Sequence, residues 1–591
     1  MRTKRKTEEK KMSMSKNIAR LAVTAGLTAA LSFGGVMAPV TMAFADGATI
    51  QDDSIVIAQS ESNKSESNNK TRFVPYQIFK AKVHDDKNGK VTSDVEWADT
   101  ITNSTTKNEI IEAIRKDASN GDKLPPTPSA QDIADWLGTY VSESEKGAGV
   151  IVKNGDLLNT IAATVKNNEQ PSGEAFDAGG SFKAESTGYY LFLTDDSSIG
   201  SKDEYSNKNQ TGTSPIFAVV GGTGVTVTEK TGIPTVTKKV KDDKPNSEWA
   251  DKADSQVGQD VQYQLTGTVA SNIATFGTYY YQFHDTLSAG LTANTESVEV
   301  RIYTENNDST GTLIDKAANH YEVGCDPQTD GKSLLTVTFG DLKTAGVVLT
   351  PDSKVVVTYT AQLNSEKAVV GSIGNDNEVK LIYSNNPMSE GKGESVPDTV
   401  RDYTYALKII KQDAAPEATK LDGVKFTIRA TDPDDAGSMN KYVNSNGVLV
   451  DKSYEFTTAN GGEIYVKGLD AGTYTVHEVE DSNPGYNTLD DFTFTIKPEG
   501  LNKDEGVALD EKTAVNTLKV TVEKPDSATM VTPSVDDGTV TLTVKNKKGS
   551  NLPLTGLNGV TFTWIAGGAV LCIGVAHLIR SGKQAEESEQ E

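Results

Sequence analysis

Apolar and polar residues alternate along short runs through most of residues 229–551. Val261–Val269, Val355–Leu363 and Gly538–Asn546 are three such runs, and turns rich in Asp, Asn and Gly separate them from their neighbours. A period of two places successive side chains on opposite faces of a strand, one face buried and one in water. We therefore predict a mainly β fold, with tandem immunoglobulin-like sandwiches over residues 229–400 and 401–551.

Residues 71–228 combine strand patterns with helical ones. Gly188–Leu193 and Pro215–Val220 are continuous apolar runs, which are typical of buried strands. Thr106–Ser119 has isoleucines at helical spacing, and Ser129–Asp132 has the form of a capping box before a second apolar pattern. We predict an N-terminal β-domain with a helical insert.

The first 45 residues have the pattern of a secretory signal peptide. A basic stretch precedes the apolar residues Leu21–Phe44, and Ala43-Phe44-Ala45 is a small-residue cleavage site. The alternative is an N-terminal membrane anchor, but Gly34 and Pro39 interrupt the apolar stretch. Residues 46–70 are rich in Ser, Asn, Asp and Lys, so we predict a flexible leader there.

The other end carries a second apolar stretch. Residues 560–579 are long enough to cross a bilayer, and Arg580 and Lys583 follow them. Basic residues on one flank favour a cytoplasmic tail. We therefore expect a single-pass span, at least in a precursor of the protein.

Composition excludes several classes of function. The net charge is −24, and such an acidic chain is poorly suited to binding nucleic acid. Two cysteines and five scattered histidines exclude a disulfide scaffold and give no pattern of metal ligands, so we expect no metal and no cofactor. The acidic turns at residues 195–198 and 432–435 lack the spacing of a calcium loop, and solvated turns are the simpler interpretation.

The two predicted sandwiches share one constellation of reactive residue types. Each has a lysine on its first strand, an acid in its middle and an asparagine on its last strand. In the C-terminal segment these are Lys411, Glu478 and Asn546, and in the middle segment they are Lys238, Asp285 and Asn377. Lys239 and Asn375 remain alternatives for the middle set.

The C-terminal end resembles the cell-wall sorting signal of Gram-positive surface proteins. The pentapeptide Leu552-Pro553-Leu554-Thr555-Gly556, the apolar span and a charged tail follow one another in order within residues 552–591. The resemblance implies that a sortase cuts after Thr555 and joins its carbonyl to an amine of the wall or of another subunit. The alternative is a plain single-pass membrane protein.

The central segments resemble sortase-assembled pilins. Tyr474–Glu478 with Pro484–Tyr486 is similar to the pilin E-box, and Gly374–Pro387 is similar to the last strand of the pilin middle domain. The resemblance implies CnaA- and CnaB-type sandwiches that form internal Lys–Asn isopeptide bonds. Burial favours the neutral, nucleophilic lysine amine, and a buried acid can polarise the asparagine amide and shuttle protons.

The same resemblance implies an acceptor lysine for polymerisation just before the middle domain. Pilins carry it in a motif ending V-Y-P-K, and here Val225–Lys230 occupies that position without the Tyr-Pro pair. Lys230 is therefore the expected partner of Thr555 from another copy of the chain.

These features predict a structural backbone subunit of a covalently polymerised pilus that supports adhesion. It would be secreted, anchored to the cell wall and exposed at the cell surface. Its expected partners are a sortase, other copies of itself, ancillary pilins, peptidoglycan and a host surface ligand, and it would not be an enzyme. The alternative is a monomeric wall-anchored adhesin or an ancillary tip pilin. A secreted hydrolase would need a catalytic pair in residues 71–228, and the sequence offers none.

Overall fold

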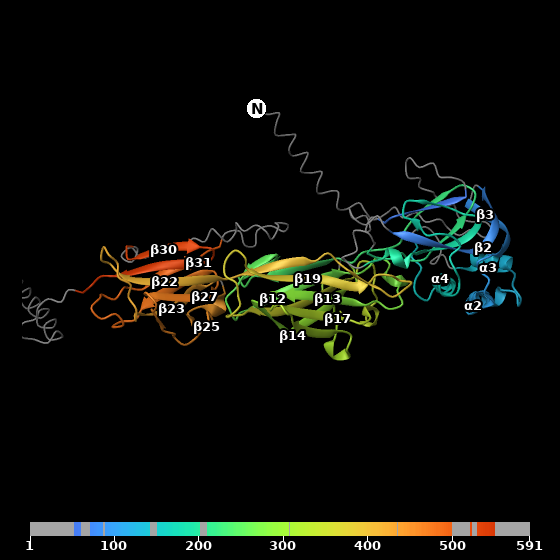
Figure 1. Ribbon diagram of the computed structural model, residues 1–591. Helices are drawn as coiled ribbons and strands as arrows, with labels where there is room; N and C mark the ends of the chain where they lie inside the picture. Colours follow the sequence, from blue (N-terminus) through green and yellow to red (C-terminus); the bar gives the residue numbers. More distant parts are fainter. Residues whose placement is uncertain are drawn as a thin grey trace, which may run out of the picture.

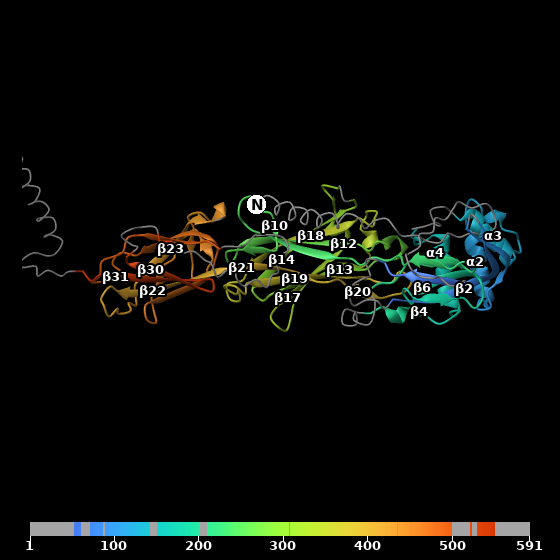
Figure 2. The same ribbon diagram turned by 90° about the horizontal axis from the view of Figure 1, so that it is seen from above.

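The computed structural model describes residues 53–60, 71–86, 89–141, 150–200, 210–305, 308–433, 435–498, 521–522 and 529–549. They form three successive units that lie in a row, so the protein is elongated (Figures 1 and 2). Strands dominate each unit, and all the α-helices of the described residues belong to the first. The predicted mainly β fold is confirmed.

The N-terminal unit contains two small sheets. One has the order β5-β1-β8, and the other has the order β3-β2-β6-β7 with β4 beside β2. The bounds are β1 Ser54–Ala58, β2 Arg72–Asp86, β3 Gly89–Trp97, β4 Phe176–Asp177, β5 Ser181–Lys183, β6 Gly188–Thr194, β7 Ile216–Val220 and β8 Val225–Thr228. β6 and β7 are buried along their whole length, as their continuous apolar sequences predict.

Three helices belong to this unit, the first two at its outer end and the third nearer the middle unit (Figures 1 and 2). They are α2 Ser104–Arg115, α3 Ala130–Tyr140 and α4 Leu157–Asn168. The predicted capping box is present, because Ser129 and Asp132 bond reciprocally at the start of α3. The helical insert is thus confirmed, although the sequence reasoning did not single out α4, whose Leu158, Ile161 and Val165 repeat at helical spacing.

One part of the predicted flexible leader is structured instead. Ser54–Ala58 forms β1, which pairs with β5 on one side and runs parallel to β8 on the other. Ile55 and Ile57 are fully buried in the core of this small sheet. The polar composition of residues 46–70 favoured the prediction of a flexible segment, although this segment contains a short strand whose alternate apolar side chains complete a core.

The middle unit is a sandwich of two sheets over one large core. The sheets have the orders β10-β9-β12-β18-β14-β15 and β11-β21-β19-β13-β17-β16, with β20 beside β19. The bounds are β9 Val236–Lys241, β10 Trp249–Ala250, β11 Lys252–Asp254, β12 Asp260–Thr268, β13 Tyr281–Leu287, β14 Leu291–Tyr303, β15 Thr312–Leu313, β16 Glu322–Pro327, β17 Ser333–Phe339, β18 Lys354–Leu363, β19 Asn375–Ser384, β20 Lys392–Glu394 and β21 Asp398–Tyr403.

The C-terminal unit is a second, smaller sandwich with its own core. Its sheets have the orders β27-β22-β31-β30 and β25-β24-β23-β28-β29, with β26 beside β23. The bounds are β22 Tyr405–Asp413, β23 Lys425–Pro433, β24 Tyr442–Val443, β25 Leu449–Val450, β26 Phe456–Thr457, β27 Glu463–Leu469, β28 Gly472–Glu478, β29 Phe492–Ile496, β30 Val531–Asp536 and β31 Thr539–Asn546. The first strand β22 and the last strand β31 are parallel neighbours.

Acidic side chains are buried where the middle and C-terminal sandwiches meet. Asp254 and Asp402 come from the middle sandwich, and Asp470 follows β27 of the C-terminal one. Burial and the neighbouring carboxylates Asp242 and Asp243 raise the pKa of Asp402 to about 8, although hydrogen bonds from Ser255 and from the backbone of Tyr403 work in the opposite direction. Burial, Asp254 and Asp243 raise the pKa of Asp470 well above its ordinary value.

These raised pKa values predict a junction that weakens with rising pH. The folded state holds protons that the unfolded state has released, so the free energy of unfolding falls as pH rises from about 4 through about 8. We expect the melting temperature to drop over this range, and Asp402→Asn, which stays neutral, to flatten the dependence. Calorimetry of both proteins across the pH series measures this, and parallel curves for the two would contradict it.

Candidate functional site

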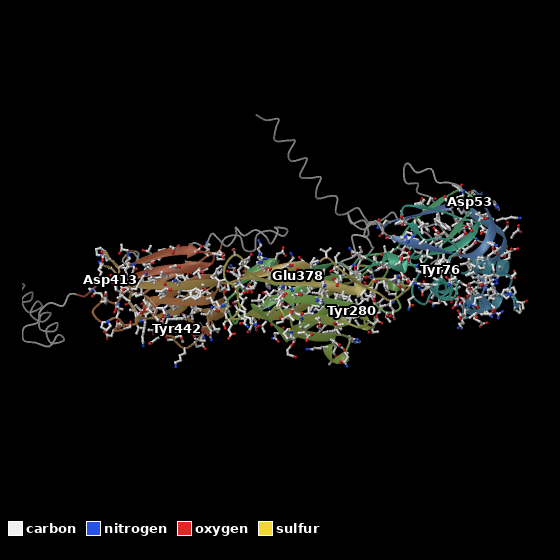
Figure 3. The ribbon with its side chains drawn as sticks, in the orientation of Figure 1. Asp53, Tyr76, Tyr280, Glu378, Asp413 and Tyr442 are labelled. Carbon is white, nitrogen blue, oxygen red and sulfur yellow. The ribbon has the colours of Figure 1, made fainter. Side chains whose placement is uncertain are left out.

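The C-terminal constellation lies on two neighbouring strands and one facing strand. Lys411 is opposite Val544 in the parallel pair of β22 and β31, and Asn546 is opposite Asp413. A period of two directs Lys411 and Asn546 to the buried face of this sheet. Glu478 ends β28 of the other sheet. Figure 3 shows Asp413 at the end of the C-terminal unit that lies away from the middle unit, so the site is near that end.

Lys411, Glu478 and Asn546 contact one another directly. The Nζ of Lys411 lies 3.1 Å from Oε2 of Glu478, and it also donates to Oδ1 of Asn546. The Nδ2 of Asn546 donates to Oε1 of Glu478 over 2.5 Å. All three side chains are at most 2 % exposed, and the ring of Phe426 lies 5.4 Å from the amine. One carboxyl thus contacts both groups that an amide-forming reaction would join.

Burial prepares the amine of Lys411 for nucleophilic attack. Desolvation lowers its pKa to about 8, although the attraction of Glu478 works in the opposite direction. At this pKa roughly a tenth of the lysines are neutral at pH 7, whereas an ordinary lysine is almost wholly protonated. The neutral amine is the form that can attack a carbonyl carbon.

The middle constellation is built across the two sheets. Lys238 lies on β9 of one sheet, between Val236 and Val240 on the buried face. Asp285 lies on β13 and Asn377 on β19, which are neighbours in the other sheet. All three of the predicted residues are fully buried. A bond from Lys238 to Asn377 would tie one sheet to the other, whereas a bond from Lys411 to Asn546 would tie two strands of one sheet.

A tyrosine that the sequence reasoning missed completes the middle site. The Nζ of Lys238 lies 2.5 Å from Oδ1 of Asp285 and 3.2 Å from the Tyr359 hydroxyl. That hydroxyl donates to Oδ2 of Asp285 over 2.6 Å and accepts from Nδ2 of Asn377 over 2.7 Å. Its position in the sequence could have pointed to it, because Tyr359 follows Val355 at an even spacing and therefore shares the buried face of β18.

The electrostatics of Lys238 resemble those of Lys411. Desolvation lowers the pKa of Lys238 to about 8, and the neighbouring Asp285 opposes this shift. Two aromatic rings, those of Tyr263 and Tyr359, each lie 5.5 Å from its amine. An amine in these surroundings loses its proton more readily than one in water.

The alternative residues of the middle set have other positions. Lys239 points away from the core and forms a 2.7 Å ion pair with Asp251. Asn375 is buried, but its side chain is bonded to the backbone of Val369 and Asp402. Of these four residues, Lys238 and Asn377 are therefore the two whose side chains both contact the Tyr359 hydroxyl beside Asp285.

The expected acceptor Lys230 lies at the junction of the N-terminal and middle units. Its backbone is bonded to Thr213, Ser214 and Asn272, and its Nζ donates to the carbonyl of Val150. Burial lowers the pKa of this amine to about 8. The lowered pKa favours the nucleophilic form of the amine, but the backbone at Val150 of the same chain lies against it.

A third set of the same residue types provides a contrast. The carboxylate of Asp196 accepts from Lys166 over 3.0 Å and from Asn386 over 2.8 Å. Here, however, the Asp196 side chain is 52 % exposed. Water stabilises the charged lysine and carboxylate in such a place, so composition alone does not make this set reactive.

Several predicted features lie outside the described residues. They are the signal peptide, the Leu552–Gly556 pentapeptide with Thr555, and the span at 560–579. Within the part of the chain that the structure describes, no helix is both long and apolar enough to cross a membrane. Cys325 is exposed on the edge strand β16.

Comparison with known proteins identifies two domain types. Residues 257–387 match the family model of the Gram-positive pilin backbone subunit 2, Cna-B-like domain. Residues 405–508 match the SpaA prealbumin-like fold domain. Among curated proteins, none matches the chain.

Solved structures that resemble the chain include two pilins. The T6 backbone pilin of serotype M6 Streptococcus pyogenes is 17 % identical, with a TM-score of 0.48, and the match covers 85 % of this chain and 99 % of that one. The major pilin SpaD from Corynebacterium diphtheriae is 16 % identical, with a TM-score of 0.43 and coverage of 84 % and 98 %. The chain therefore carries one domain of the Gram-positive pilin backbone type, followed by a prealbumin-like domain.

Proposed function

We propose that this protein is the structural backbone subunit of a covalently polymerised, wall-anchored surface pilus, stabilised by two self-formed Lys–Asn isopeptide bonds. The observation that carries the proposal is the buried contact of Lys411, Glu478 and Asn546 between the first and last strands of a sandwich. A matched pilin backbone domain in the middle unit supports the same role.

The reaction exchanges an amide for an amide and releases ammonia. Lys411 passes a proton to Glu478, and its neutral Nζ attacks Cγ of Asn546. The attacking nitrogen then loses a proton, Glu478 returns one to the Nδ2 leaving group, and the C–N bond breaks. The proton that the attacking nitrogen loses stays on Glu478, which therefore ends protonated, and each domain reacts once. The protein is therefore not an enzyme in the sense of turnover.

The position of the C-terminal bond suits a subunit under tension. The chain enters this sandwich at β22 and leaves it after β31, and the two strands are parallel neighbours. A bond between Lys411 and Asn546, 135 positions apart, carries the load directly from one strand to the other. The intervening chain then bears none of it, and the sandwich cannot be drawn out.

Intact mass spectrometry of a recombinant ectodomain tests the two bonds. We expect a mass below that of the sequence by two ammonias, with crosslinked peptides that join Lys411 to Asn546 and Lys238 to Asn377. The set of Lys166, Asp196 and Asn386, whose acid is half-exposed, serves as the internal control and is expected to stay unlinked. A mass equal to that of the sequence would refute the isopeptide bonds. A third missing ammonia would refute the requirement for burial.

Lys230 and Thr555 would join successive subunits through a sortase, and the last subunit would be attached to peptidoglycan. The alternative is a monomeric wall-anchored adhesin or a tip subunit that binds a host ligand. The contact of the Lys230 amine with Val150 favours this alternative, because a covered amine must be released before it can be acylated. A ladder of covalent multimers of this protein in wall extracts would support the polymer, and a single monomer-sized band would support the adhesin.

A further inference from the structure

The middle site differs from the C-terminal one in how its acid contacts the asparagine. Glu478 contacts both Lys411 and Asn546 directly. Aspartate is shorter by one methylene, and Asp285 in the middle site contacts Lys238 and the Tyr359 hydroxyl. The hydroxyl in turn accepts from Nδ2 of Asn377, so it spans the gap between acid and amide.

We propose that Tyr359 is a catalytic residue of the middle-domain crosslinking reaction, its hydroxyl relaying a proton between Asp285 and the leaving nitrogen of Asn377. The inference rests on the proposed isopeptide function and assigns a residue that the C-terminal site does not need.

Atoms and charges balance in this relay. Lys238 first passes a proton to Asp285, and its neutral Nζ then bonds to Cγ of Asn377, whose carbonyl oxygen becomes an oxyanion. Three proton transfers follow, from Nζ to Oδ1 of Asp285, from Oδ2 of Asp285 to the Tyr359 oxygen, and from that oxygen to Nδ2. The carbonyl reforms, the bond to Nδ2 breaks and ammonia leaves. Tyr359 regains its starting protonation, and Asp285 ends with the one extra proton that the Lys238 ammonium brought.

The surroundings of Tyr359 suit a relay. Burial and the nearby Asp285 raise its pKa well above the ordinary value, so the hydroxyl keeps its proton between steps. Its ring is stacked on Tyr263 with centroids 5.4 Å apart and an interplanar angle of 16°, which holds the hydroxyl in place. The oxygen Oδ1 of Asn377 has no hydrogen-bond partner among the described residues, and Nδ2 of the same amide donates to the Tyr359 hydroxyl.

The stacked pair supplies a matched test. Tyr359→Phe and Tyr263→Phe each remove one hydroxyl and leave the ring in the core, and the Tyr263 hydroxyl has no hydrogen-bond partner among the described residues. We expect Tyr359→Phe to slow formation of the Lys238–Asn377 bond by roughly 100-fold. Tyr263→Phe is expected to react at the wild-type rate. Mass spectrometry at timed intervals after cell-free synthesis measures both, and the C-terminal bond reports correct folding and timing in the same molecule.

The outcomes separate the relay from the function on which it rests. A wild-type rate for Tyr359→Phe, or equal slowing by both variants, would overturn the relay and leave the crosslink intact. A wild-type protein without the Lys238–Asn377 bond would overturn the crosslink itself. Should Tyr359→Phe fail to fold, the relay is tested on the wild-type protein instead, by measuring the rate of Lys238–Asn377 bond formation in mixtures of light and heavy water. Several protons in motion give a curved dependence on deuterium content, and a linear one would contradict the relay.

Discussion

Replacing Lys230 by alanine is expected to abolish the high-mass ladder of this protein in cell-wall extracts boiled in SDS. An amide between subunits survives boiling, whereas any noncovalent assembly dissociates. Lys230 lies at the junction of two units with an amine whose pKa burial lowers to about 8. Without that amine, the Thr555 carbonyl of the next subunit has no acceptor. Immunoblots of the native host carrying the variant measure the loss.

Two controls sharpen this result. Lys230→Arg keeps a cation near the carbonyl of Val150 but offers no amine that a sortase can acylate in the same way, so we expect it to lose the ladder as well. Lys239→Ala removes an ion-paired lysine of β9 and is expected to leave the ladder unchanged. A ladder that survives Lys230→Ala would move the acceptor to another lysine, such as Lys239 or Lys241. A single monomer-sized band in the wild type would favour the anchored adhesin.

Glu478→Gln is expected to prevent the C-terminal bond and to destabilise that sandwich strongly. The substitution keeps the size of the side chain and its capacity for hydrogen bonds, but it removes the group that accepts and returns the proton. A crosslink between residues 135 positions apart lowers the conformational entropy of the unfolded chain. In the entropy model developed for disulfides, this raises the free energy of unfolding by about 5 kcal/mol. For a domain of this size, that loss lowers the melting temperature by roughly 15–20 °C.

The matched control for this variant is Glu463→Gln on β27. Glu463 forms a 2.9 Å ion pair with Lys408 at the surface of the same sandwich, so its loss is expected to change stability little. Calorimetry gives the melting temperatures, and intact mass reports one missing ammonia in Glu478→Gln and two in Glu463→Gln. A Glu478→Gln protein that still lacks two ammonias would contradict the role of the acid.

The fold class follows from local pattern, and this part could be predicted. The alternation along Val355–Leu363 became β18, and the capping box at Ser129 begins α3, because such signals act between near neighbours in the chain. The strand β1 escaped prediction because its partners β5 and β8 are far from it in sequence. Ser54–Ala58 alone is too short to signal a strand within a polar stretch.

The sequence alone determined the residue types of the candidate sites, their order along the chain and the parity that directs Lys238 and Asn377 inward. Only the tertiary structure decided which lysine meets which acid, that Tyr359 joins the middle site, and that the acid of the similar set, Asp196, is half-exposed. The physical reason is that reactivity here depends on desolvation and on contacts across facing sheets. Both arise only when strands far apart in the chain enclose a common core.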